Sequence, residues 1–142
     1  MTIDNNLEHF EEVFCATSYV VFLPKFTAIL RLYEKNSHFD DWLRNYKFYN
    51  WIFVTGYNPR GKKISVEANL IRHRKLLIDV KLMSWKMTFG EARPLGSWLA
   101  EPGVFIFDIP LIDVSFLADS YGQLAVVTGH CGDVAKLCWV QS

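Results

Sequence analysis

Cysteine is scarce in this chain, and neither sign of charge dominates it. The three cysteines, Cys15, Cys131 and Cys138, are odd in number and lack C-x-x-C spacing, which argues against a disulfide framework and against a zinc site. Fifteen Lys and Arg residues balance fifteen Asp and Glu residues, so the formal net charge is +0. A neutral protein has no general attraction for nucleic acid or anionic lipid, and we expect neither as a partner.

Long apolar runs are also missing. No run approaches the roughly 20 residues that span a bilayer, so we expect no membrane association. The N-terminal stretch MTIDNNLEHFEE is polar and acidic, unlike a secretory signal. Together with the sparse cysteines, these features predict a cytoplasmic protein.

The sequence motifs that mark known catalytic and cofactor sites are absent. The chain has no G-x-x-x-x-G-K-[ST], G-x-G-x-x-G, G-x-S-x-G or H-E-x-x-H. Its four histidines are scattered, and no nucleophile, base and orienting group occur together. We therefore expect no cofactor and no metal, and the sequence leaves open whether the protein is an enzyme.

Apolar residues, in contrast, are abundant, and their pattern predicts alternating helices and strands. They make up 51% of the 142 residues, and we predict one domain over residues 1–142. Strands are expected at 17–23, 26–33, 49–55, 85–89, 103–107, 124–128 and 135–140, and helices near the N-terminus and at 36–47, 65–84 and 110–121. The predicted fold is α/β (or α+β), a mixed β-sheet with about four helices packed on about six to seven short strands. The strand 49–55, the long helix and a later strand would form a crossover.

The stretch FVTGYNPRG, residues 53–61, stands out at the end of a predicted strand. Its Asn-Pro pair and two glycines predict a turn between strand and helix. Tyr57, Asn58 and Arg60 leave the strand at its carboxyl end, where ligands bind in sheets with helical crossovers. The N-terminus of the next helix adds a partial positive charge there.

Polar residues also interrupt the apolar face of that helix. Asn69 and His73 fall on the side that should cover the sheet, and a buried polar group without a partner costs about 1–3 kcal/mol. His73 is either a core histidine bonded to backbone or a catalytic residue. Asn69, with Arg72 three residues later, is expected to complete a polar corner that suits a carboxylate, a phosphate or an amide-bearing group.

The same helix carries a second apolar stripe, formed by Ile71, Ile78 and Leu82, that faces the other way. A helix that is apolar on two sides is either wholly buried or covers a partner subunit. We therefore expect a homodimer.

Four segments occur in one order and carry a resemblance. They are Thr55-Gly56-Tyr57-Asn58-Pro59-Arg60, Glu67 with Asn69, Trp98 with Glu101-Pro102, and Tyr121-Gly122-Gln123-Leu124-Ala125. Through them, residues 50–128 resemble a bacterial family catalogued as domain of unknown function 3293. Gly56 stands where the family has alanine, and two residues instead of one separate Trp98 from Glu101. The resemblance implies a small cytoplasmic α/β or α+β protein with no known reaction.

The resemblance also extends the candidate site. It implies that Asn58, Asn69, Glu101 and Gln123 converge at one edge of the sheet, either as a binding site or as an amide network that holds the loops. The first functional hypothesis is a binding or interaction module whose amide-rich site lies at the 55–69 loop–helix junction and takes a small anionic or amide-bearing ligand or a protein partner. Its candidate residues are Tyr57, Asn58, Arg60, Asn69, Arg72, Glu101 and Gln123. The alternative is a small enzyme that acts on an anionic metabolite, with Glu101 or His73 as the acid–base group.

Overall fold

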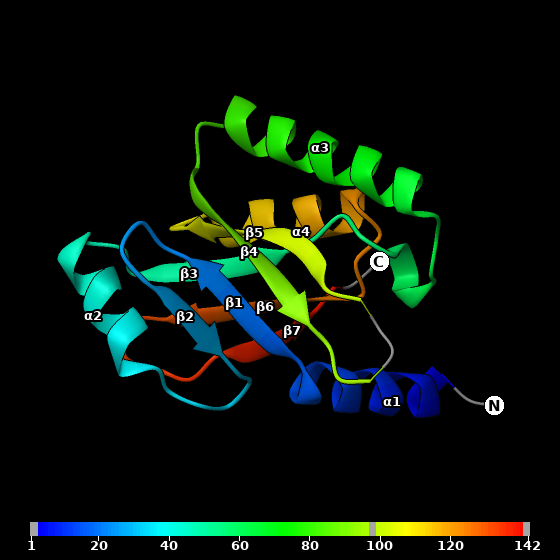
Figure 1. The fold of residues 1–142 in the computed structure, drawn as a ribbon, viewed down its shortest axis with the longest axis horizontal. Helices are drawn as coiled ribbons and strands as arrows, with labels where there is room; N and C mark the ends of the chain where they lie inside the picture. The colour runs from blue at the N-terminus through cyan, green and yellow to red at the C-terminus, as the bar shows by residue number, and fades with distance from the viewer. Residues whose placement is uncertain (1–2, 97–98, 141–142) are drawn as a thin grey trace.

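A curled, seven-stranded sheet carries four helices (Figure 1) in the computed structural model, which describes residues 3–96 and 99–140. The helices are α1 (Ile3–Ala16), α2 (Ser37–Asn45), α3 (Val66–Leu82) and α4 (Leu111–Ser120), with a short 3-10 turn η1 (Pro59–Gly61). The strands are β1 (Ser18–Phe22), β2 (Thr27–Leu30), β3 (Asn50–Val54), β4 (Lys86–Arg93), β5 (Glu101–Phe107), β6 (Ala125–His130) and β7 (Lys136–Trp139).

The strand order is β2-β1-β4-β5-β3-β6-β7, and each pair of neighbours is antiparallel. Because β5 lies between β3 and β4, these two strands run in the same direction, and α3 connects them. In the same way β3 lies between β5 and β6, which α4 connects. The segment β3-α3-β4-β5-α4-β6 therefore forms two interleaved split βαβ units, the ferredoxin-like arrangement. The hairpin β1-β2 extends it beyond β4, and β7 extends it beyond β6.

The predicted fold class, the number of helices and the number of strands are confirmed. The prediction of a mixed sheet is wrong, because every pair of neighbouring strands in the described chain is antiparallel. Both helical crossovers skip one position, and an antiparallel strand fills each gap. A parallel contact occurs as an isolated bridge between Leu32 and Ala135.

Local signals set the limits of the helices as the sequence predicts. Ser65 caps α3, since its hydroxyl accepts a hydrogen bond from the Ala68 N–H at 3.1 Å. Gly122 follows α4 with a φ of 64°, the left-handed conformation that ends many helices. No helix in the described ranges is long and apolar enough to cross a membrane.

The two faces of the sheet bury different cores, and β3 contributes to both. Ile52 and Val54 face α3 and α4, in a core of aliphatic side chains. Trp51 and Phe53 face the opposite way, in a core rich in aromatic rings where Trp51 meets Phe39 of α2. Successive residues of a strand point to opposite faces, which explains why the doubly covered β3 reads as a continuous apolar run.

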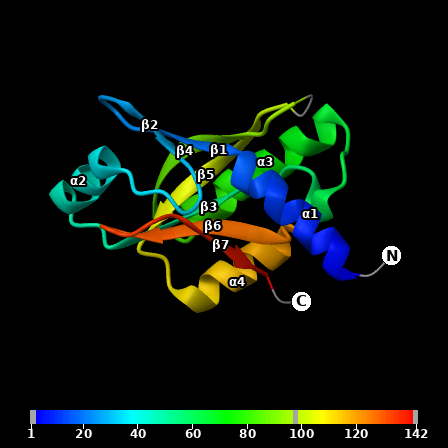
Figure 2. The same cartoon turned by 90° about the horizontal axis from the view of Figure 1, so that it is seen from below.

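On the aromatic face the sheet curls until its two ends meet. The Tyr33 N–H donates to the Ala135 carbonyl at 2.8 Å, beside the Leu32–Ala135 bridge. Helix α2 follows directly from this bridge, whereas α1 lies across the other end of the same face (Figure 2). Phe14 of α1 packs edge-on against Trp139 of β7, with ring centroids 6.1 Å apart.

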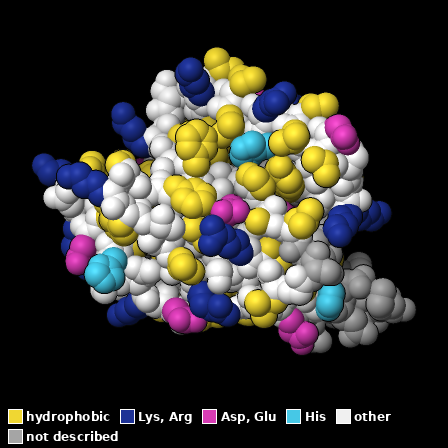
Figure 3. Space-filling view, viewed as in Figure 1, with side chains coloured by type: hydrophobic (Ala, Val, Ile, Leu, Met, Phe, Trp, Pro, Cys, Tyr) yellow, Lys and Arg dark blue, Asp and Glu magenta, His cyan; other side chains and the backbone are white. Residues whose placement is uncertain are grey.

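The outer surface of α3 carries an exposed apolar stripe, as its sequence predicts. Ile71, Ile78 and Leu82 are all exposed. Hydrophobic side chains gather over α3 and β4 in the space-filling view, with Lys and Arg side chains around them (Figure 3). The homodimer stays a prediction.

Candidate functional site

The loop between β3 and α3 is a compact turn that its own side chains stabilise. The Thr55 hydroxyl accepts from the Tyr57 N–H at 3.1 Å and donates to the Pro102 carbonyl at 2.7 Å, which ties the loop to β5. Asn58 then adopts the left-handed conformation, with a φ of 46°, and η1 follows. Asparagine tolerates this conformation better than most residues, so the predicted turn is present for a local reason.

Two asparagines from the loop and the helix bind each other in both directions. The Asn58 N–H donates to Asn69 Oδ1 at 2.8 Å, and Asn69 Nδ2 donates to Asn58 Oδ1 at 2.9 Å. The Ile64 N–H also donates to Asn58 Oδ1, at 3.2 Å. Asn69 is only 5% exposed, so these bonds resolve the predicted conflict of an amide on the buried face of α3.

Asn58 also connects this amide pair to a carboxylate. Its Nδ2 donates to Glu101 Oε1 at 2.6 Å, across 43 positions of sequence. Burial raises the pKa of the Glu101 carboxyl above its ordinary value of 4.5, and the hydrogen bond from Asn58 opposes part of that rise. No other hydrogen bond within the described residues reaches the Glu101 carboxylate, so its second oxygen, Oε2, is uncommitted.

The side chains of Arg72 and Gln123 stabilise the loop through hydrogen bonds to backbone carbonyls. Arg72 donates from Nε to the Gly56 carbonyl at 2.6 Å and from Nη2 to the Tyr121 carbonyl. Gln123 Nε2 donates to the carbonyls of Tyr57, at 3.1 Å, and Tyr121, at 3.3 Å. Both side chains therefore join the 55–61 loop to the segment after α4.

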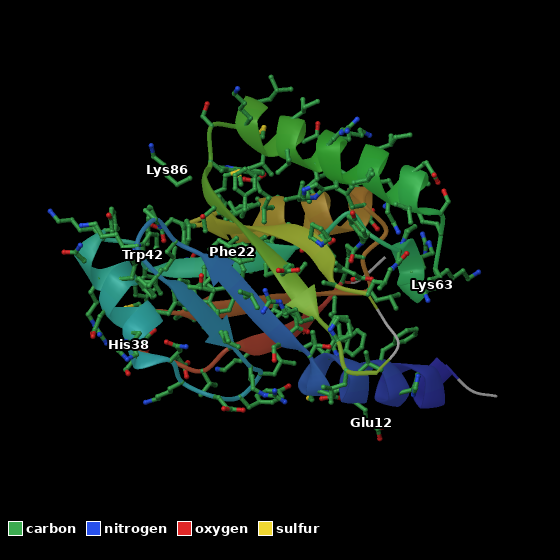
Figure 4. All side chains as sticks on the ribbon, in the orientation of Figure 1. Glu12, Phe22, His38, Trp42, Lys63 and Lys86 are labelled. Carbon is green, nitrogen blue, oxygen red and sulfur yellow. The ribbon has the colours of Figure 1, made fainter. Side chains whose placement is uncertain are left out.

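A mostly apolar cavity of about 130 Å³ lies between α1 and the aromatic face of the sheet. Figure 4 labels Lys63, at the end of the loop, and Glu12, on the side of α1 that points away from the sheet. The cavity walls come from α1, five strands (β1, β3, β4, β5 and β6), the loop and the segment before β6. The residues that line the cavity include Phe10, Phe14, Tyr19, Phe53, Ala92 and Glu101.

The seven candidate residues from the sequence divide into three groups in the structure. Tyr57, Asn58, Glu101 and Gln123 line the cavity. Asn69 and Arg72 do not line it and support the loop through the bonds described above. The side chain of Arg60 is exposed, and its backbone N–H donates to the Gly122 carbonyl at 2.7 Å.

His73 lies apart from this cavity. Its ring meets that of Tyr57 edge-on, with centroids 6.1 Å apart. Its Nδ1 is buried and has no hydrogen-bond partner in the described part of the chain, so the backbone-bonded histidine predicted from the sequence is not found at this atom. Burial lowers the pKa of the imidazole, because the charged form is poorly solvated there.

The sequence interpretation missed the side of the cavity that α1 provides. Phe10, Val13 and Phe14 line the cavity on the side of α1, and Tyr19 and Phe53 line it on the side of the sheet. Helical spacing predicts that Phe10 and Phe14 share a buried face, but it does not distinguish residues that fill a core from residues that surround a cavity. Among the residues with coordinates described, no group of three His, Cys, Asp or Glu side chains gathers to hold a metal ion.

A comparison with protein families shows the family to which the chain belongs. The sequence model of a family described as Protein of unknown function (DUF3293) matches residues 54–126. The chain belongs to the DUF3293 family. The family segment contains Asn58, Asn69, Glu101 and Gln123, whereas α1 lies before it; Trp98 falls within it but outside the described residues. No curated protein and no solved structure matches this DUF3293 chain.

Proposed function

We propose that this DUF3293 protein is a binding module whose ligand occupies the cavity between α1 and the sheet. The observation that carries this proposal is the Glu101 carboxylate, which lines a largely apolar cavity and is held there by Asn58. Small ligands bind in concave apolar pockets that contain a few fixed polar groups. The raised pKa of Glu101 is a second feature typical of such sites.

The amide network gives this site a rigid polar wall. Asn58 bonds to Asn69 and Glu101 at once, so α3, the loop and β5 position the carboxylate together. A group held from several elements loses little freedom when a ligand binds, which favours affinity. Compared with the site predicted at the 55–69 junction, the proposed binding surface moves to the side of the loop that faces α1. The free thiols Cys15, Cys131 and Cys138 favour a reducing compartment such as the cytoplasm.

Filling the cavity tests the proposed function. Ala92 is buried on β4 and lines the cavity, so the added methyl groups in Ala92→Val would occupy space that a ligand needs. We expect toluene, a neutral probe, to stabilise the wild-type protein by about 1.4 kcal/mol at ten times its dissociation constant, and to leave Ala92→Val unaffected. The measurement is urea unfolding with and without toluene.

Ala28→Val provides the matched control for this experiment. Ala28 is a buried strand alanine of the same aromatic core, and it does not line the cavity. Its substitution should leave the stabilisation by toluene intact, whatever it does to the stability of the free protein. Equal stabilisation of all three proteins by toluene would place the probe elsewhere and contradict the proposed function.

An enzyme that uses Glu101 as its acid–base group is a second candidate. It is favoured by the raised pKa of Glu101 and by its uncommitted Oε2. His73 is not favoured as the acid–base group of this candidate, because it does not line the cavity. This candidate predicts turnover of a cavity ligand, whereas a binding module releases its ligand unchanged.

Glu101→Gln should change how the stability of the protein depends on pH. Because burial raises the folded-state pKa, the stabilisation from Glu101 is fully present below the unfolded pKa of about 4.5 and is lost as pH rises through the folded pKa. Glutamine can accept the same hydrogen bond from Asn58 without a charge. We therefore expect the variant to equal the wild type at about pH 4 and to be the more stable of the two at about pH 7.

Urea unfolding at both pH values measures this effect, with Glu91→Gln as the control. Glu91 lies on β4 beside Pro102, does not line the cavity, and forms an ion pair with Arg93 at 2.9 Å. Its substitution should leave stability unchanged or slightly lower at about pH 7. A Glu101→Gln protein less stable than the wild type at about pH 7 would show that the bond between the charged carboxylate and Asn58 outweighs the cost of burial.

A further inference from the structure

The described lining of the cavity contains one carboxylate and neither Lys nor Arg. Its titratable lining groups are His9 of α1, Tyr19 of β1, Tyr57 of the loop and Glu101 of β5, and no Lys or Arg lines it within the described residues. The guanidinium of Arg72 is committed to two backbone carbonyls. An anionic ligand would therefore meet a carboxylate and no compensating Lys or Arg, so this lining favours other ligands over the anionic one among the anionic ligand, amide-bearing ligand and protein partner predicted from the sequence.

Two acceptor atoms of the cavity wall have no donor within the described residues, beside the Tyr57 hydroxyl and the His9 imidazole, which can both donate and accept. Glu101 uses Oε1 to accept from Asn58 and has Oε2 to spare. Gln123 Nε2 donates to the carbonyls of Tyr57 and Tyr121, and these bonds fix the orientation of the amide. Its Oε1 accepts no hydrogen bond from the described residues. These two acceptors, one of which is a carboxylate, favour a ligand that donates hydrogen bonds.

The apolar wall is aromatic, and the cavity is small. Rings of Phe10, Phe14, Tyr19, Phe53 and Tyr57 line it. Aromatic faces attract cations, most strongly where water is excluded. The volume of about 130 Å³ is close to that of engineered cavities of about 150 Å³ that hold a benzene molecule.

We propose that the ligand of this cavity is a small primary ammonium compound with an apolar body about as large as one aromatic ring. The ammonium group would donate to Glu101 Oε2 and Gln123 Oε1, and the apolar body would pack among the aromatic side chains. The pairing of two desolvated charges is favourable when hydrogen bonds satisfy both, which the fixed carboxylate and amide provide. This inference rests on the proposed binding function of the same cavity and adds the chemical class of the ligand.

Four probes that share one ring test the ligand class. They are benzylammonium, benzyl alcohol, toluene and benzoate, each titrated at neutral pH against the ¹⁵N-labelled protein and followed by NMR. We expect benzylammonium to bind the wild type at least about tenfold more tightly than toluene or benzyl alcohol, with benzoate the weakest, because hydrogen bonds to a charged group are the strong ones. The backbone signals that shift should be those of residues that line the cavity.

Two carboxylate-to-amide variants separate the role of Glu101 from a general effect of charge. Glu101→Gln should weaken benzylammonium binding by about tenfold or more and leave toluene within about twofold of the wild type. Glu91→Gln removes the same charge from a residue that does not line the cavity, and it should leave both probes unchanged.

The possible outcomes distinguish the ligand class from the binding function. If toluene binds in the cavity but benzylammonium binds no more tightly, the ammonium class is overturned and the binding function stands. The class is likewise overturned if Glu101→Gln binds benzylammonium as well as the wild type does. If none of the four probes shifts the signals of the cavity residues, both proposals fail.

Discussion

Asn69→Ala is expected to destabilise the protein by about 2–4 kcal/mol. The substitution removes both hydrogen bonds between Asn69 and Asn58 from a position that is only 5% exposed. The Asn58 N–H is then left without its partner, and a buried polar group without a partner costs more than the loss of an average hydrogen bond. The loss should therefore exceed what the smaller side chain alone would cause.

Urea unfolding of Asn69→Ala, Asn58→Ala and the double variant measures this effect. Since the two side chains bond to each other, their effects should not add, and we expect a coupling free energy of about 1 kcal/mol or more. Asn45→Ala is the control, because Asn45 is exposed at the end of α2 and should change stability by less than about 0.5 kcal/mol. A loss below about 1 kcal/mol for Asn69→Ala would mean that water replaces the amide, and the network could not be what positions the loop.

Gly61→Ala should detach α1 from the loop and open the cavity. Gly61 has a φ of 70°, and an added Cβ would lie 2.5 Å from Cε1 of Phe10, the α1 residue that covers this part of the cavity. Left-handed backbone costs about 1–2 kcal/mol for a residue other than glycine, and the steric conflict adds about 1–3 kcal/mol unless Phe10 moves away. We expect the free energy of unfolding to fall by about 2–5 kcal/mol in total, unless α1 is released from the loop and relieves the steric conflict.

Gly96→Ala separates these two costs. Gly96 has a φ of 82°, so it carries the same backbone penalty, but an added Cβ meets nothing within 4 Å. Hydrogen exchange should show faster exchange of the amides of α1 in Gly61→Ala only, and toluene affinity should fall at least about tenfold in that variant alone. Equal exchange in α1 for both variants would show that Phe10 adapts in place and that α1 does not depend on its contact with Gly61.

The elements of this fold could be predicted from the sequence because local chemistry sets them. Ser65 and Gly122 act within a few residues of their own positions, and β3 reads as a short apolar run because both of its faces are buried. The order of the strands could not be predicted in this way. It depends on which partner fills the gap left by each helical crossover, and that choice is made by packing between distant segments.

The candidate site was predictable where a polar residue contradicted its surroundings. Asn69 on an apolar helix face required a partner, and the partner is the loop residue Asn58. The same reasoning assigned Arg72 to the ligand, whereas in the structure its guanidinium donates to the carbonyls of Gly56 and Tyr121. No sequence signal separates a backbone-binding arginine from a ligand-binding one.

The bridge between Leu32 and Ala135 has a consequence for association between chains. An exposed strand at the side of a sheet offers unpaired N–H and C=O groups, to which another chain can add a strand and begin to aggregate. In this protein β1 covers β4, β7 covers β6, and the segments next to β2 and β7 bond to each other. A fragment limited to residues 50–130 would keep β3, β4, β5 and β6 but lose β1, β2 and β7, and it would leave the side of β4 open to strand addition. The added strands β1, β2 and β7 thus protect the ferredoxin-like core from aggregation through its edges.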